Sequence, residues 1–287
     1  MNYTALIENR KSVREFRTKA VPADLVEAIR SYHDKGCMRL DDTIATRLVV
    51  LDTRSREALE GSAGYEDYLI GAPCYLVLLS ERKDRAYENG GYMMEDMILK
   101  LNDLGLDACW ITFHREEEVR AALGLGDDME IAAVAAFGYG QKTARRLRLN
   151  IRNMTKVDVV ARRGYFSPKK DISQLAFLNE VGNTQGLDEH IGFYEDMLWQ
   201  ALYAVSLTPS YLNRQSYCFV LKGQDVILVS LPDPYTDEVS QKLNLGIAML
   251  HFGAAAEQWV GRIRWDLADA PALALPEGAS VSAVYHM

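Results

Sequence analysis

The chain has 287 residues, of which 48% are hydrophobic and 25% are charged, and its formal net charge is −8. This length accommodates one large domain or two modest ones, with a sizeable core in either case. The acidic total argues against a nucleic-acid-binding surface, although it leaves room for a local basic pocket.

The N-terminus lacks the basic and then apolar profile of a signal peptide. The longest apolar runs, such as residues 74–79, have the length of a strand and are too short to span a bilayer. The four cysteines contain no C-x-x-C motif, and the five histidines show no metal-ligand spacing. We therefore expect a cytoplasmic protein with free thiols, no membrane partner and no metal.

Helices and strands alternate along the first half of the chain. Apolar residues at helical spacing predict helices over residues 3–8, 23–33, 55–59, 91–104 and 116–123. Short apolar runs predict strands over residues 47–51, 73–79, 108–111 and 131–137. The apolar stripe of the helix over 91–104 is interpreted as core rather than as a cofactor contact; it comprises Met94, Met97, Ile98 and Leu101.

Residues 141–163 have a different character, because they carry eight basic side chains and a single acidic one. Such a run is commonly a solvated arm. A second interpretation, in which part of it holds a bound phosphate, depends on the family resemblance given below.

The pattern of elements then starts again, with helices over 193–207 and 245–259 and strands over 217–221 and 226–230. Gly91 and Trp110 are 19 positions apart, as are Gly246 and Trp265, and the same offset of 155 pairs Met94 with Met249. We interpret the chain as two diverged halves, residues 1–165 and 166–287, packed around a pseudo-two-fold axis.

The halves differ in the polar residues they carry. Ser210, Asn213 and Gln215 lie between a helix and a strand of the second half, and they offer a hydroxyl and two amides to a flat heterocycle. Pro-Ser and Asn are also ordinary turn formers. The aligned segment of the first half has Asp42 and Ile44 in place of Asn213 and Gln215, and only the first half has a basic opening. This division predicts one composite site per chain.

Four segments resemble the nitroreductase family of FMN proteins. Arg10-Lys-Ser-Val-Arg-Glu-Phe16 is similar to its R-[RHK]-S-x-[RK]-x-F opening, and residues 209–217 are similar to its P-S-x-x-N-x-Q-P-W segment. Residues 105–111 resemble G-L-G-x-C-W-[IL], and residues 137–140 resemble a late A-L-G-Y strand end. The resemblance covers nearly the whole chain. It implies an α+β, nitroreductase-like fold in which each half has a mainly antiparallel sheet flanked by helices.

The resemblance also implies that one chain replaces the interlocked dimer of the family, as a monomeric pseudo-dimer that can associate further. FMN would lie between the halves. Arg10 and Ser12 would hold its phosphate, with Lys11 beside the ribityl chain or the phosphate, and Arg14 would reach the ribityl chain and the N1/O2 edge. A cation at that edge would stabilise the reduced flavin.

The opposite half would line the flavin with Pro209, Ser210, Asn213 and Gln215. Arg146 and Arg148 fit the basic pair with which the family closes on the phosphate, although Arg145 and Arg152 leave the register open. Near flavin N5 this chain has Thr112 and Phe113, where many relatives have glycines; a backbone N–H could still serve N5.

The function that the resemblance implies is transfer of hydride from NADH or NADPH, via flavin N5, to a nitroaromatic, a quinone or a similar small-molecule acceptor. Such a ping-pong reaction needs no acid–base residue from the protein. A storage or sensor protein that binds FMN without turnover is the alternative, which Thr112 and Phe113 favour. A scaffold protein without flavin is a third hypothesis. The presence of both Arg10 with Ser12 and Asn213 with Gln215 argues against it.

Overall fold

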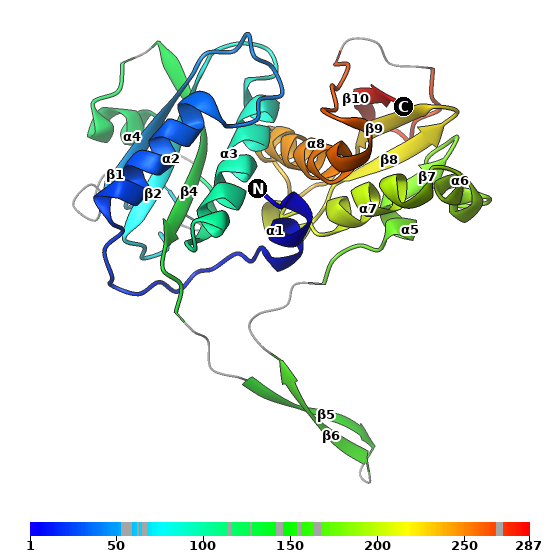
Figure 1. Ribbon diagram of the computed structural model, residues 1–287, viewed down its shortest axis with the longest axis horizontal. Coiled ribbons are helices and arrows are strands. Elements are labelled where there is room, and N and C mark those ends of the chain that lie inside the picture. The colour runs from blue at the N-terminus through cyan, green and yellow to red at the C-terminus, as the bar shows by residue number, and fades with distance from the viewer. Residues whose placement is uncertain are drawn as a thin grey trace.

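The computed structural model describes residues 1–52, 59–61, 63–64, 68–113, 116–126, 128–141, 146–153, 156–162, 168–267 and 272–287. The body contains two four-stranded sheets, one on each side of a pair of central helices (Figure 1). The first sheet uses residues 46–138 and the second uses residues 176–286. This is the α+β arrangement that the resemblance implied.

The first sheet is antiparallel throughout. Its strands, in spatial order, are β1 (Thr46–Asp52), β2 (Cys74–Glu81), β4 (Met129–Gly138) and β3 (Asp107–Ile111). The sheet is covered on both faces, which is why β2 and β4 are continuous apolar runs. Alternate residues of β2 enter separate cores: Tyr75 and Val77 pack on one face, and Leu76 and Leu78 on the other.

Four helices accompany the first half of the chain. They are α1 (Tyr3–Asn9), α2 (Ala23–Lys35), α3 (Ala86–Asp103) and α4 (Glu116–Leu123). The predicted apolar stripe of α3 is buried against the sheet, since Met94, Met97, Ile98 and Leu101 are all at most 1% exposed. Their interpretation as core residues is confirmed.

The second sheet is antiparallel except for one parallel pair, β7 with β8. Its strands, in spatial order, are β10 (Ser280–His286), β9 (Asp225–Ser230), β8 (Tyr217–Lys222) and β7 (Ala176–Leu178). The helices of this half are α5 (Ile172–Leu175), α6 (Leu187–Phe193), α7 (Glu195–Ser206), the 3-10 turn η2 (Tyr211–Asn213) and α8 (Glu238–Val260).

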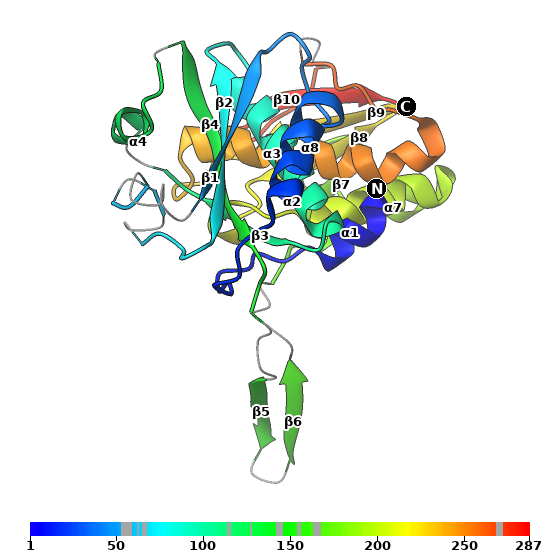
Figure 2. The same ribbon diagram turned by 60° about the vertical axis from the view of Figure 1, so that its left-hand side comes forward.

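The two central helices, α3 and α8, lie against each other in both views (Figures 1 and 2). They approach so closely that a side chain at Gly91 would overlap the backbone of Leu243, and one at Gly246 would overlap the backbone of Glu88. One hydrophobic cluster crosses this contact, and it joins Tyr92 and Leu99 of α3 to Leu245 and Met249 of α8. Glycine is required here because the backbones themselves touch.

The strands β5 (Arg146–Asn153) and β6 (Lys156–Arg162) pair only with each other among the described residues. They form a ribbon that projects away from the body in both views (Figures 1 and 2). The sequence indicated either a solvated arm or a phosphate clamp over this segment. Its backbone forms an antiparallel hairpin.

Several element boundaries differ from the sequence prediction. The central helices begin earlier than expected, at Ala86 and at Glu238; the side chain of Asp237 caps α8 by accepting from the N–H of Ser240 at 2.8 Å. The helix expected over 193–207 is α7, which begins at Glu195, and the unpredicted helix α6 ends directly before it at Phe193. The strands β7 and β10 were not predicted, and the helix expected over 55–59 falls mostly outside the described residues.

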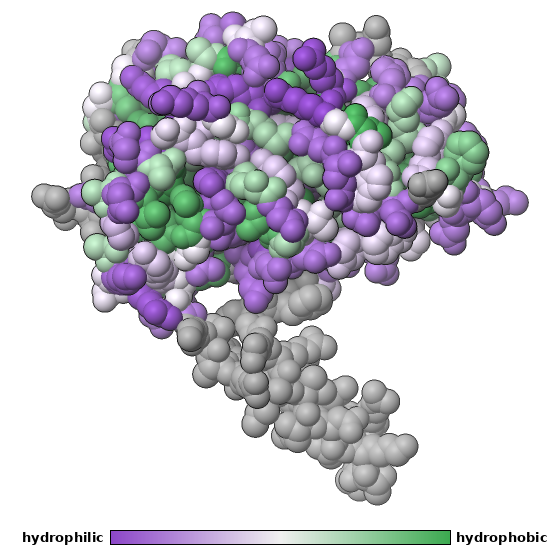
Figure 3. All heavy atoms as spheres, viewed as in Figure 1, coloured by the Kyte–Doolittle hydropathy of each residue, from purple (hydrophilic) through white to green (hydrophobic). Residues whose placement is uncertain are grey.

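None of the described helices combines the length and the hydropathy needed to cross a bilayer. On the face of the body shown in Figure 3, hydrophilic residues dominate and hydrophobic ones gather in small patches.

Candidate functional site

Arg10 lies at the junction of the two halves, directly after α1. Its Nε is 3.5 Å from Oε1 of Glu95 on α3, and the two side chains are 6% and 0% exposed. The Nε of Arg10 is buried and has no hydrogen-bond partner among the described residues. A nearly buried guanidinium with an unused donor is poised for an additional acceptor.

Glu95 is the acidic centre of this junction. Its Oε2 accepts from Nε1 of Trp110 at 2.7 Å, and its Oε1 lies 3.0 Å from Nε2 of His251 on α8. Burial opposes ionisation, but Arg10, His251 and Trp110 together outweigh it and hold the pKa of Glu95 below its usual range. Because Glu95 belongs to α3 and His251 to α8, this carboxylate ties the two central helices together.

The basic opening of the chain runs beside β3. Ser12 forms a parallel bridge with Ala108, and the N–H of Val13 donates to the carbonyl of Ala108 at 3.0 Å. Burial raises the pKa of the Cys109 thiol on β3, and the positive charges of Arg14 and Arg10 oppose this rise. Lys11 and Arg14 are exposed, so they are free to meet a ligand.

The second-half segment, residues 208–216, forms an unusual turn. Leu212, Asn213 and Gln215 all have positive φ, between 45° and 59°, a conformation that non-glycine residues seldom adopt. The turn is held internally by the hydroxyl of Ser210, which accepts from the N–H of Gln215 at 2.9 Å. Such strained backbone is characteristic of functional segments that their surroundings hold in place.

Lys169 connects this turn to the basic opening. Its Nζ donates to the carbonyl of Thr208 at 2.7 Å and to Oδ1 of Asn213 at 2.5 Å. Burial and the nearby charge of Arg10 together lower the pKa of Lys169 to about 8, although the charge of Glu95 opposes them. The predicted residues Arg10 and Asn213 therefore lie around one shared neighbour, although 203 positions separate them.

The sequence analysis missed Lys169. Its only signal was the pair Lys169-Lys170, which follows Pro168 directly before the first helix of the second half. Arg146 and Arg148, the residues proposed for the phosphate, belong to β5, and the structure describes only the backbone of that strand. Their role as a clamp stays a prediction, while Lys169 provides a cation next to Arg10.

Gln215 and Pro209 are both buried. The amide of Gln215 accepts from the N–H of Lys170 at 2.9 Å and donates to the carbonyl of Ser206 at 3.0 Å. These bonds fix the turn to the segment that carries Lys169. Direct contact of Gln215 with a flavin remains a prediction, since both ends of its amide already have partners.

Thr112 and Phe113 follow the end of β3. The hydroxyl of Thr112 donates to the carbonyl of Gly64 at 3.0 Å, and Phe113 forms an antiparallel bridge with Ala63. Phe113 also packs on the hydrophobic cluster that contains Phe16. Both residues are thus fixed to the segment 63–64 beside the end of β3.

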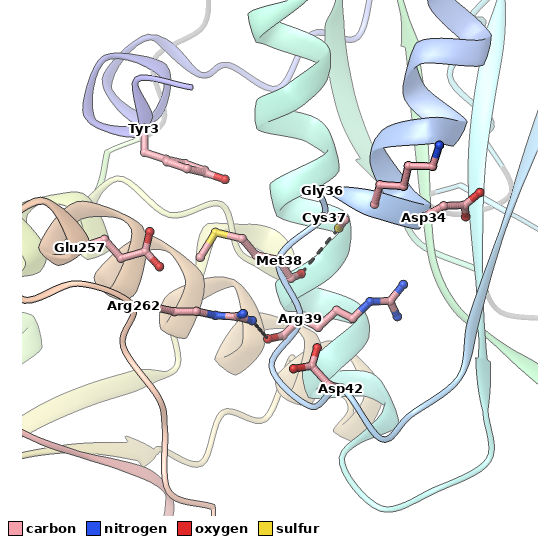
Figure 4. A pocket seen from close by; sticks show the side chains of 10 residues that line it. Tyr3, Asp34, Gly36, Cys37, Met38, Arg39, Asp42, Glu257 and Arg262 are labelled. Carbon is pink, nitrogen blue, oxygen red and sulfur yellow. Dashed lines mark hydrogen bonds between the residues drawn. The ribbon is translucent and has the colours of Figure 1, made fainter.

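A separate pocket of about 470 Å³ lies between the segment 36–42 and the end of α8 (Figure 4). Arg262 of the second half reaches across it, and its Nη2 donates to the carbonyl of Arg39 at 3.3 Å. The pocket belongs to the first-half segment that was aligned with residues 209–216. It is lined by Asp42, the counterpart of Asn213, and by no residue of the predicted flavin set.

The chain matches a protein-family model described as "Putative TM nitroreductase" over residues 2–256. A solved structure from Thermotoga maritima, likewise described as a nitroreductase, covers 100% of this chain and 94% of its own at 18% identity, with a TM-score of 0.59. This likeness shows that the fold is nitroreductase-like.

Two structures from Clostridium difficile cover about half of this chain. One, a nitroreductase family protein of strain 630, covers 50% of this chain and 87% of its own at 18% identity, with a TM-score of 0.44. The other, an FMN-dependent nitroreductase of strain R20291, covers 48% and 88% at 17% identity, with a TM-score of 0.42. No curated protein sequence matches the chain.

Proposed function

Because the chain belongs to the nitroreductase family, we propose that it is an oxidoreductase that binds one FMN between its two halves. The observation that carries this proposal is the pair of cations at the junction. Arg10 comes from the first half and Lys169 from the start of the second, and a single carboxylate, Glu95, lies near both. A phosphate would supply the missing negative charge and accept from the unused Nε of Arg10.

Further residues fit the remainder of the cofactor. Ser12 and Arg14 lie along β3 on the first-half side, and Ser210 and Asn213 lie on the second-half turn. We propose that these groups hold the ribityl chain and the ring, together with Lys11, Pro209 and Gln215. Bound FMN would supply the atom that accepts hydride from NADH or NADPH and passes it to a nitroaromatic, a quinone or a similar acceptor.

The protein itself would bind the cofactor, orient it and limit which molecules reach its ring. Arg14 would offset negative charge on the reduced ring, and the backbone at Thr112 would face its reactive edge. The side chain of Phe113 would limit which substrates can stack on the flavin ring at this edge. We expect the reaction to occur in the cytoplasm, where thiols such as Cys37, Cys74, Cys109 and Cys218 stay reduced.

The second candidate is a protein that stores or senses FMN without turnover, which the bulk of Phe113 next to Thr112 favours. Anaerobic mixing of the FMN-loaded protein with NADPH, and separately with NADH, distinguishes the two. Rapid bleaching of the flavin absorbance, followed by recovery when a quinone is added, supports the oxidoreductase. Bleaching no faster than that of free FMN would assign the protein to storage or sensing.

A further inference from the structure

The β5–β6 ribbon has two chemically different faces. Its register sets Leu147 opposite Ala161, Leu149 opposite Val159, and Ile151 opposite Val157. Residues that alternate along a strand belong to opposite faces, so these three pairs share one face. The pair Arg146 and Arg162 belongs to the other face. Among the described residues no other strand pairs with this ribbon. An isolated hairpin is at best marginally stable, so we expect its apolar face to be covered by another surface.

The charge of this segment indicates which kind of surface the ribbon would bind. Residues 141–167 contain eight basic residues and one acidic residue, a net charge of +7, whereas the whole chain carries −8. The remaining residues therefore carry −15. Electrostatic complementarity of this size steers two copies together through ribbon and body.

The body presents a surface with matching chemistry, here called the α7 face. It follows α6, α7 and the end of α8. A hydrogen bond from Nε2 of Gln258 to Oε1 of Gln200 at 3.2 Å links α8 to α7. Its aromatic residues are Phe193 at 79% exposure, Trp199 at 48%, Trp259 at 40%, and Tyr203, which stacks on Trp199 at 5.2 Å. Its exposed acidic residues are Asp188, Glu189 and Asp196.

Exposed aromatic side chains on neighbouring helices are typical of a protein–protein contact. The apolar face of the ribbon would cover the aromatic rings of the α7 face. The positive charge of the segment is complementary to the carboxylates beside those rings. Each surface therefore offers what the other lacks.

We propose that the β5–β6 ribbon of one chain docks with its apolar face on the α7 face of a second copy. The ribbon stands clear of its own body in both views (Figures 1 and 2), so it is available to another molecule. When each chain contributes one ribbon and one α7 face, the exchange is reciprocal and closes as a two-fold dimer. This association does not depend on the proposed flavin chemistry.

Sedimentation equilibrium of the full chain tests the proposal with two pairs of variants. Leu149→Asp places a charge on the apolar ribbon face, and Val160→Asp places the same charge on the opposite face, where residue 160 pairs with Arg148. Trp199→Arg disrupts the α7 face, and Tyr235→Arg makes the same change at an exposed tyrosine before the start of α8, the end far from Trp259. Circular dichroism verifies that each variant is folded.

We expect the wild type, Val160→Asp and Tyr235→Arg to be dimers. Leu149→Asp and Trp199→Arg should each raise the dissociation constant by about tenfold or more. A mixture of the two defective variants should associate better than either alone, because it pairs an intact ribbon with an intact α7 face. A monomeric wild type, a dimer indifferent to Leu149→Asp or Trp199→Arg, or a mixture without recovery would each overturn the proposal.

Discussion

Gly91 of α3 and Gly246 of α8 make reciprocal contacts across the junction of the two halves. Gly91 touches the backbone of Leu243, and Gly246 touches the backbone of Glu88. The same offset of 155 positions separates Gly91 from Gly246 and Glu88 from Leu243. This is the geometry that a two-fold axis between the central helices produces, while the division into residues 1–165 and 166–287 stays a prediction.

Gly246→Ala should destabilise the protein by about 1–3 kcal/mol, because the added methyl group has no room against the backbone of α3. Gly192→Ala is the matched control, since a Cβ on this glycine of α6 meets nothing within 4 Å. It should be neutral, or stabilising by up to about 1 kcal/mol. Urea denaturation measures both changes, and equal effects of the two substitutions would contradict the close approach.

Glu95→Gln should cost about 3 kcal/mol of stability near neutral pH, because it leaves Arg10 as a buried charge without a counter-ion. Glu238→Gln, which removes an exposed partner of Lys242 on α8, should change stability by less than about 1 kcal/mol. Urea denaturation compares the two. The stabilisation from Glu95 is present above the usual glutamate pKa and is lost as the pH falls through its lowered pKa, so the difference between Glu95→Gln and the wild type should shrink in acid.

Arg10→Ala and Asn213→Ala should weaken the same single FMN, although they lie in different halves. Loss of a charge-assisted bond at Arg10 should raise the dissociation constant about tenfold to about a hundredfold, and loss of the neutral amide should raise it less. Arg30→Ala, at an exposed position of α2, is the control and should have no effect. Fluorescence titration with FMN gives both the affinity and the stoichiometry. Two FMN per chain would contradict the composite site.

FMN affinity should fall as the pH rises from about 7 to about 9 in the wild type. Burial places the pKa of Lys169 at about 8 in the free protein, so deprotonation in this range removes a charge that a phosphate would favour. Lys169→Arg should keep a high affinity across the range, and Lys169→Met should bind weakly at every pH. The titrations are repeated at each pH, and a wild-type slope that persists in Lys169→Met would exclude Lys169 as its source.

The sequence located most elements because their patterns are local. The buried runs of β2 and β4 and the apolar stripe of α3 are visible in the order of the residues alone. The strands β7 and β10 were not predicted, for two different reasons. The first has three residues and exists only through parallel pairing with β8, and the second is a short alternating segment at the end of the chain.

The sequence by itself determined the family resemblance, the α+β class, and the two polar sets around Arg10 and Asn213, because each depends on residue types at short spacing. Only the tertiary structure decided that Lys169 lies between those sets and that Glu95 and His251 join the central helices. It also decided that the amide of Gln215 is already bonded to Lys170 and Ser206. The bond between Glu95 and His251 alone joins residues 156 positions apart. Such distances close only when the two halves pack against each other through their glycine contacts.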